Sequence, residues 1–211
     1  MNGLSNDSSH RRTIVVVDGR ATIAQRFATD WTRLGSDGQA FHDDPAQNSN
    51  WYAYGVDVLS VHRGRVTGAQ DGITENNPTA DHKAVPIDLN TVAGNYLIVQ
   101  IAPYRYALYA HLQPGSFKVR VGDRVKAGDL LARLGNSGNS DAPHLHFHVC
   151  DRNSPLGCEG IPYVFDCFSQ FGEVPSLEVL TNGVGWKPIE NGSPKLRKHE
   201  LPTSNAVVRF Q

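Results

Sequence analysis

Short runs of apolar residues, many of them β-branched or alternating with polar residues, recur along the chain between turns rich in glycine and proline. Regular spacing of such runs is typical of an all-β sandwich or barrel. Helical periodicity is weak, and the one short helix that we expect, at residues 170–180, is interrupted by Pro175. The expected strands cover residues 13–17, 56–61, 96–101, 106–110, 117–121, 130–134, 145–149 and 206–210.

Two polar segments, residues 37–50 and 71–88, predict long surface loops. Loops of this length in a compact domain often form the walls of a functional groove. Residues 182–203 show little periodicity. We therefore expect one β domain at residues 1–181 and an irregular C-terminal tail at 182–211 that packs on this domain.

Composition narrows the possible functions. The 211 residues are enough for one domain with a substantial core, and the formal net charge of −1 argues against nucleic-acid binding through bulk charge. No apolar run approaches the roughly 20 residues that a membrane span needs. The polar N-terminus lacks the basic-then-apolar order of a signal peptide, so we expect either a cytoplasmic protein or a mature fragment of an exported one.

The three cysteines, Cys150, Cys158 and Cys167, lie close together in the sequence. Their spacing is not that of a zinc knuckle, which uses two close pairs. A disulfide between Cys150 and Cys158 would form in an oxidising compartment. Buried thiols are the alternative, and the sequence leaves both open.

Residues 143–148 read Pro-His-Leu-His-Phe-His. Successive side chains of a strand point to opposite faces, so His144, His146 and His148 should share one face while Leu145 and Phe147 pack on the other. Imidazole is the commonest metal ligand in proteins and a general base near neutral pH. This strand therefore indicates a metal site or proton-transfer chemistry.

Two other residues stand in a context that suggests chemistry. His111 ends an alternating strand just before a turn at residues 113–115. Asp30 ends an apolar stretch, where a buried carboxylate needs a partner because an isolated buried charge is costly. A metal ion would serve as that partner.

Together these segments resemble the M23 family of zinc metallopeptidases, the lysostaphin or LytM-like peptidoglycan endopeptidases. The resemblance covers about residues 22–149 and implies a small antiparallel β-sandwich with a groove. The segments that carry it are Asp30 and residues 109–112, 121–129, 134–140 and 143–147.

The resemblance also implies roles for individual residues. Asp30 and His146 match metal ligands, and His111 and His144 match the two non-ligand histidines beside the metal-bound water. The implied cofactor is Zn²⁺, and the implied substrate is a peptide bond of bacterial peptidoglycan, which places the protein in the cell envelope or outside the cell. Asn139 is close enough to the histidines in sequence to contact substrate.

The chain departs from the family pattern at its first metal ligand, where Arg26 replaces histidine. Arginine stays protonated and cannot ligate a metal, and we expect it to pair with Asp30. His10 is the favoured replacement, because a ligand from another segment completes a tetrahedron more easily than a further residue of the same strand. His148 is the alternative. Arg26 also favours a rival function, a non-catalytic M23-like domain that binds cell wall or regulates another hydrolase.

Overall fold

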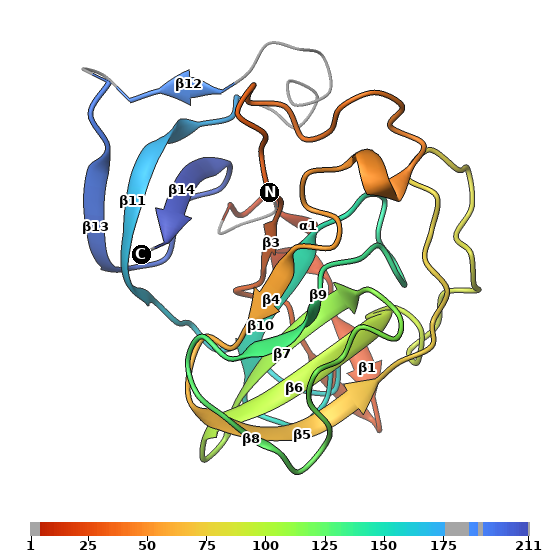
Figure 1. The fold of residues 1–211 in the computed structure, drawn as a ribbon. Helices are drawn as coiled ribbons and strands as arrows, with labels where there is room; N and C mark the ends of the chain where they lie inside the picture. The colour runs from red at the N-terminus through yellow and green to blue at the C-terminus, as the bar shows by residue number, and fades with distance from the viewer. Residues whose placement is uncertain (1–4, 176–185, 190–191, 211) are drawn as a thin grey trace.

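The computed structural model describes residues 5–175, 186–189 and 192–210, and almost all of its regular structure is β (Figure 1). The helical elements are the single turn α1 (Ser9–Arg12) and the 3-10 turn η1 (Asn48–Asn50). The strands are β1 (Val15–Val17), β2 (Arg20–Thr22), β3 (Thr29–Trp31), β4 (Asp57–Leu59), β5 (Gly64–Gln70), β6 (Asn95–Ala102), β7 (Arg105–Leu112), β8 (Arg124–Val125), β9 (Leu130–Arg133), β10 (Leu145–Cys150), β11 (Phe165–Glu173), β12 (Lys187–Pro188), β13 (Lys195–Glu200) and β14 (Ala206–Phe210).

The central sheet is antiparallel and has the strand order β3-β10-β7-β6-β5-β8. The long strands β6, β7 and β10 lie inside this order, and the three-residue strand β3 forms one edge. A separate two-stranded ribbon pairs β4 with β9. None of these sheets closes on itself, so the expected all-β antiparallel fold is confirmed in its open form.

The main core lies between the central sheet and the β4–β9 ribbon. Alternation along each strand sends one set of apolar side chains inward, including Leu97, Tyr109, Leu131 and Phe147, all of which are almost fully buried. Burial of this apolar surface is the main force that holds the two sheets together. The opposite face of β10 is thereby left for its polar side chains.

Most of the predicted strands are observed, and two expectations are wrong. Residues 117–121 form no strand: Phe117 and Val119 pack against the core, but the hydrogen bond from Lys118 N to Leu131 O is the one backbone bond that connects this segment to a strand, in place of a ladder. The helix expected at 170–180 is wrong over its first residues, which belong to β11, and residues 176–180 lie outside the described residues.

The C-terminal region is more regular than expected. In the described residues, β12, β13 and β14 all pair with β11, and this group lies at the upper left of Figure 1. Aromatic rings connect it to the central sheet, because Trp31 of β3 packs edge-on against Phe165 and Phe210 at centroid distances of 5.8 and 5.3 Å. No helix in the described part of the chain has the length and apolar character of a membrane span.

The open question about the cysteines is also answered. Cys150, at the end of β10, forms a disulfide with Cys158 and closes the short loop between them. Cys167 lies outside this bond, in β11.

Candidate metal centre

The alternation predicted for β10 is confirmed by burial and contacts. Leu145 and Phe147 belong to the core, whereas His146 and His148 lie together on the other face, with His146 Nε2 3.0 Å from His148 Nδ1. Both of these histidines are buried, and His144 is half-buried.

Asp30 is the residue around which the site is organised. Strand β3 pairs with β10 in a register that sets Asp30 directly opposite His146. The Oδ1 atom of Asp30 lies 2.9 Å from His146 Nδ1 and 3.6 Å from His144 Nε2, and its Oδ2 atom lies 3.5 Å from His10 Nε2. One carboxylate from an edge strand therefore contacts three imidazoles.

The electrostatics of Asp30 follow from these neighbours. Burial by itself raises the pKa of this carboxyl, but His144, His146 and His10 outweigh burial and hold the pKa of Asp30 well below its usual range. The carboxylate is thus ionised, and as an ionised group it only accepts hydrogen bonds. A carboxylate oxygen that lies next to several imidazole nitrogens provides the atoms and the negative charge that bind a divalent cation.

His10 reaches the site from α1, far from β10 in the sequence. Its ring packs edge-on against His146 at 4.8 Å between centroids, and its Nδ1 atom is buried with no hydrogen-bond partner in the described part of the chain. Burial, followed by the charge of His146, lowers the pKa of His10 to about 4. His10 is therefore neutral near neutral pH, which is the form that binds metals.

Arg26 does not pair with Asp30, and this expectation is wrong. Its Nε and one terminal nitrogen each lie 2.7 Å from Oε1 of Glu159. The reason is local: residues 24–27 form a turn, and the strand that carries Asp30 begins only at Thr29. The alternation that would have set Arg26 on the face of Asp30 therefore does not apply, and the guanidinium lies away from the carboxylate.

The donor set fits zinc. One ligand atom each from His10, Asp30 and His146 lie within 4.8 Å of one another, and all three residues are buried. Imidazole nitrogen and carboxylate oxygen are ligands that Zn²⁺ takes in catalytic sites with three protein ligands. The orphaned Nδ1 atom of His10 and the charge of Asp30 are both features that a bound cation would compensate.

His111 and His144 lie beside this donor set with their rings 4.8 Å apart. The Nδ1 atom of His111 lies 2.7 Å from the carbonyl oxygen of Ser137, and that of His144 lies 2.8 Å from the carbonyl oxygen of Ala142. A carbonyl oxygen only accepts, so both rings carry a proton on Nδ1. In the neutral form of either ring, the lone pair is on Nε2.

The backbone of His111 is strained, although the residue lies at the end of a predicted strand. Its φ of 63° is in the left-handed region, which is uncommon outside glycine and costs about 1–3 kcal/mol. Hydrogen bonds from His111 N to Ala93 O and from Gly135 N to His111 O hold the residue in place. Strain of this kind is found at functional sites, where the surrounding structure enforces a particular side-chain direction.

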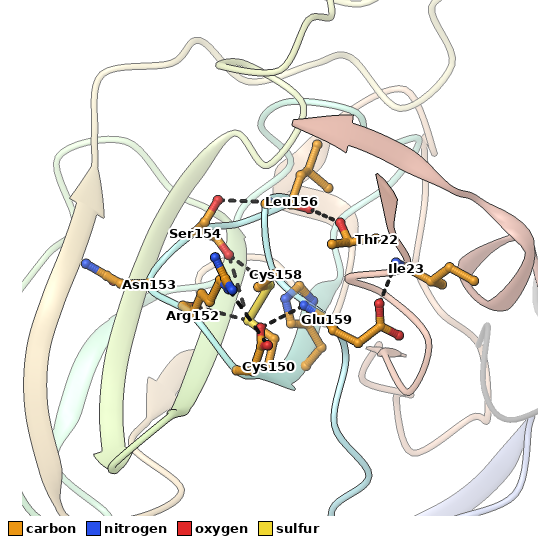
Figure 2. Close-up of a disulfide and its surroundings, with 12 residues drawn as sticks. Thr22, Ile23, Cys150, Arg152, Asn153, Ser154, Leu156, Cys158 and Glu159 are labelled. Carbon is orange, nitrogen blue, oxygen red and sulfur yellow. Dashed lines mark hydrogen bonds and ion pairs between the residues drawn. A yellow bond between two sulfur atoms is a disulfide. The ribbon is translucent and has the colours of Figure 1, made fainter. Parts of the chain in front are cut away.

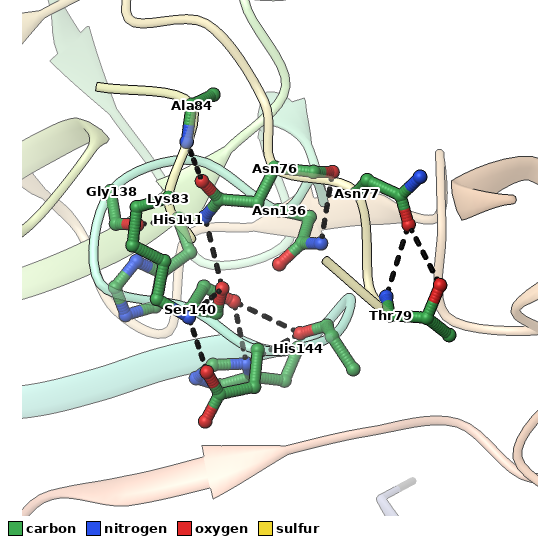
Figure 3. A network of polar contacts seen from close by, with 12 residues as sticks. Asn76, Asn77, Thr79, Lys83, Ala84, His111, Asn136, Gly138, Ser140 and His144 are labelled. Atoms are coloured by element: carbon green, nitrogen blue, oxygen red, sulfur yellow. Dashed lines mark hydrogen bonds and ion pairs between the residues drawn. The ribbon is translucent and has the colours of Figure 1, made fainter. Parts of the chain in front are cut away.

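A residue that the sequence did not single out supports the turn beside His144. Asn76, in the long loop 71–88, donates from Nδ2 to the carbonyl oxygens of Gly138 and Ser140 and accepts from Ala84 N (Figure 3). Ser140 in turn has its hydroxyl 3.2 Å from His144 Nδ1. The loop thus positions the site, and an asparagine in a polar loop offers no sequence signal for this.

Asn139 lies in the same turn and is exposed. The small cavity on the histidine side has a volume of about 20 Å³ and is lined by His111, His146, Val92 and Leu156, among others. A much larger cavity, of about 1140 Å³, lies on the apolar side of β10 and extends to the C-terminal strands. We assign the chemistry to the histidine side, because His111 and His146 line the small cavity, although Asp30 is among the residues that line the large one.

Comparison with known proteins adds the family. The sequence model of peptidase family M23 matches residues 51–157, slightly more than half of the chain. The protein belongs to peptidase family M23. Peptidases of this family are zinc metallopeptidases, in agreement with the donor set around Asp30.

Curated M23-type relatives match only in part. Lysostaphin from Staphylococcus simulans is 33% identical over 105 residues, which are 48% of this chain and 20% of that protein. Peptidoglycan DD-endopeptidase ShyB from Vibrio cholerae is 36% identical over 78 residues, 37% of this chain and 18% of that protein. The murein hydrolase activator EnvC from Escherichia coli is 32% identical over 114 residues, 53% of this chain and 26% of that protein.

Solved structures are similar at lower identity. The catalytic domain of lysostaphin from Staphylococcus simulans is 20% identical, with 61% of this chain and 88% of that chain covered at a TM-score of 0.38.

The M23 match covers only part of the candidate site. His111, His144 and His146 lie within residues 51–157, whereas His10 and Asp30 lie before them.

Proposed function

We propose that this M23 protein hydrolyses amide bonds in the peptides of bacterial peptidoglycan, with Zn²⁺ as cofactor. The observation that carries the proposal is the buried carboxylate of Asp30 in contact with His10, His144 and His146, with His111 beside them. Such a cluster combines metal donors with groups that can move a proton.

The residues divide into two roles. Asp30, His146 and His10 would hold Zn²⁺, which when bound polarises the scissile carbonyl and lowers the pKa of a water molecule towards about 7. His111 and His144 present Nε2 atoms whose lone pairs are directed away from the carbonyls that bind Nδ1. One of these nitrogens accepts a proton of the attacking water and returns it to the amine nitrogen, which leaves as the C–N bond breaks. The other, in its protonated form, donates a hydrogen bond to the oxyanion that develops.

The names of the relatives support the choice of substrate. Lysostaphin, a glycyl-glycine endopeptidase from Staphylococcus capitis and the DD-endopeptidase ShyB all match this chain at 33–36% identity. A protein that acts on this substrate works in the cell envelope or outside the cell. The exposed Asn139, in the turn next to His144, is our candidate for substrate contact.

The test is a metal analysis followed by a digest. The purified protein should contain about one zinc ion per chain by elemental analysis, and the zinc-loaded protein should release new amines from muropeptides or from oligoglycine. A chelator should abolish this activity, and added Zn²⁺ should restore it. Metal-free protein after purification and loading with Zn²⁺ would contradict the proposal.

A second function is favoured by two observations. Arginine replaces the usual first ligand, and one relative is named as an activator of murein hydrolases. On this alternative the domain binds cell wall or another hydrolase without cleaving bonds. It predicts binding to purified cell wall with no release of amines at any zinc concentration, whereas the hydrolase predicts release that depends on zinc.

A further inference from the structure

A second cluster of metal-binding atoms lies further along β10. One ring nitrogen of His148 and the Sγ atoms of Cys150 and Cys158 lie within 4.8 Å of one another, and all three side chains are almost completely buried. In the structure the two sulfurs form a disulfide, so they have no thiolate to offer. The cluster shares no residue with the donor set of His10, Asp30 and His146, although His148 contacts His146.

His148 has an orphaned nitrogen. Its Nδ1 atom is engaged by His146 Nε2 at 3.0 Å, whereas its Nε2 atom is buried and has no hydrogen-bond partner within the described ranges. A buried polar atom without a partner costs about 1–3 kcal/mol. An unpaired buried atom of this kind indicates that the nitrogen binds a ligand, or that it gains a partner when neighbouring residues change their chemical form.

The hydrogen-bond chain shows which form this nitrogen takes. Asp30 is an acceptor, so His146 carries a proton on Nδ1 at 2.9 Å. In the form in which His146 is neutral, its Nε2 atom accepts from His148 Nδ1, and a neutral His148 then has its lone pair on Nε2. Since Nδ1 is engaged by His146, Nε2 is the nitrogen of His148 that is available to bind a cation.

We propose that the thiolates of Cys150 and Cys158, together with Nε2 of His148, form a second site for a soft divalent cation such as Zn²⁺ when the disulfide is reduced. Two cysteines and one histidine are an established zinc ligand set. The cysteines are already adjacent because the disulfide joins them, so the site needs no new approach of distant segments.

Reduction of the Cys150–Cys158 disulfide requires a reductant, which we take to be a dithiol. Thiol–disulfide exchange transfers two electrons and two protons to the cysteines, and the dithiol leaves as a disulfide. Binding of the cation then displaces the two thiol protons, since thiolate is the form that ligates metals.

Contacts around the loop link this site to the N-terminal segment. Thr22 donates to the carbonyl oxygen of Leu156, and Ile23 N donates to Glu159, on either side of Cys158 (Figure 2). These contacts do not involve the sulfurs. They can persist after reduction and keep the loop over the second site.

The experiment uses the full chain with Cys167→Ser, so that only two cysteines remain. Oxidised and reduced samples are titrated with Co²⁺ in the absence of oxygen, because thiolate ligation of Co²⁺ produces an intense near-ultraviolet charge-transfer band. We expect this band only after reduction, at one ion per chain. Cys150→Ser should abolish it, and His148→Gln should weaken Co²⁺ binding by at least about tenfold.

Two controls keep the result decisive. Asp30→Asn disables the first site and should leave the thiolate band in place, so failure of the hydrolase proposal does not affect this test. Near-ultraviolet circular dichroism reports whether the reduced chain keeps its packing. The proposal is overturned if the folded, reduced protein gives no thiolate band, if His148→Gln binds as tightly as its parent, or if the reduced chain unfolds and Co²⁺ does not restore it.

Discussion

The two halves of the candidate metal centre are built differently. His111, His144 and His146 come from the region that matches family M23, and they are carried on or next to the long inner strands β7 and β10. His10 and Asp30 come from before that region, from a single helical turn and a three-residue edge strand. His111, His144 and the metal ligand His146 therefore depend on long strands, and we call them the strand half. The metal ligands His10 and Asp30 depend on short elements, and we call them the N-terminal half.

The comparison indicates how the site diverged. His146 is held by ladders on both sides, opposite Asp30 of β3 and Ala110 of β7, so its position is fixed by two neighbouring strands. The N-terminal segment is held by fewer contacts, among them those of Thr22 and Ile23 with the disulfide loop. A short segment of this kind can lose one ligand and provide another from a different position, as our proposal requires, in which His10 takes the place of the histidine expected at position 26.

The largest effect should come from removing one ligand from each half. We expect Asp30→Ala and His146→Ala each to lose bound zinc and to reduce hydrolysis by about a thousandfold or more, because several kcal/mol of transition-state stabilisation depend on the metal. Elemental analysis and a muropeptide digest measure both effects. Asp43→Ala, at an exposed carboxylate that pairs with His42, is the matched control and should change neither. Stoichiometric zinc in either ligand variant would break the assignment.

The next largest effect tests the two proton-handling histidines of the strand half. His144→Ala and His111→Ala should lower the rate by about 10²–10⁴-fold, the usual contribution of general acid–base catalysis, while zinc content stays near that of the parent. Rate and metal content measured on the same samples separate this outcome from ligand loss. Full activity in either variant would remove that histidine from the mechanism.

The third prediction tests whether His10 is the third zinc ligand. We expect His10→Ala to weaken zinc binding by about tenfold to a hundredfold or more, since a missing donor costs at least as much as a missing supporting contact. His148→Ala should weaken it less, because His148 contacts His146 and not Asp30 in the described hydrogen bonds. Zinc titration against a competing chelator provides the ranking, and the reverse order would make His148 the third ligand.

The pH dependence of stability should differ with and without His10. In the folded, metal-free protein, burial lowers the pKa of His10 to about 4, whereas in the unfolded chain it is about 6.5. The unfolded state therefore binds more protons between these values, and the free energy of unfolding falls as the pH decreases through this window, by up to about 1.4 kcal/mol per pH unit for this residue. His111 and His148, whose pKa values burial also lowers, act in the same direction.

Denaturant unfolding of chelator-treated protein between pH 7 and pH 4.5 measures this slope. His10→Gln should make the slope shallower. An unchanged slope would show that His10 is not buried in the metal-free protein.

The smallest effect concerns Arg26. Its ion pair with Glu159 is partly exposed, and such pairs contribute about 0–1 kcal/mol. We therefore expect Arg26→Ala to lower the free energy of unfolding by less than about 1 kcal/mol and to leave zinc content unchanged. Loss of zinc in this variant would mean that Arg26 helps to position the ligands His10 and Asp30. The N-terminal half would then depend on more than its two ligands.

Much of the fold was predictable because its signals are local. The runs that became β6, β7 and β10 are long and apolar, and turns bound them on both sides. The prediction of a strand at 117–121 was wrong, because apolar residues form a strand only where a neighbouring strand is available to pair with them. The strand expected at residues 206–210 is observed as β14, whereas β12 and β13 were missed because their sequences are polar and their pairing with β11 is a long-range property.

The sequence by itself determined the shared face of His144, His146 and His148, since side-chain alternation is a local property of any strand. It also determined that Arg26 cannot be a ligand, which is a matter of its chemistry. Only the tertiary structure decided that His10 meets Asp30, that Arg26 lies against Glu159, and that His148 connects His146 to the cysteines. These contacts join residues up to more than a hundred positions apart, and their geometry depends on strand register and on where turns begin, which local sequence does not specify.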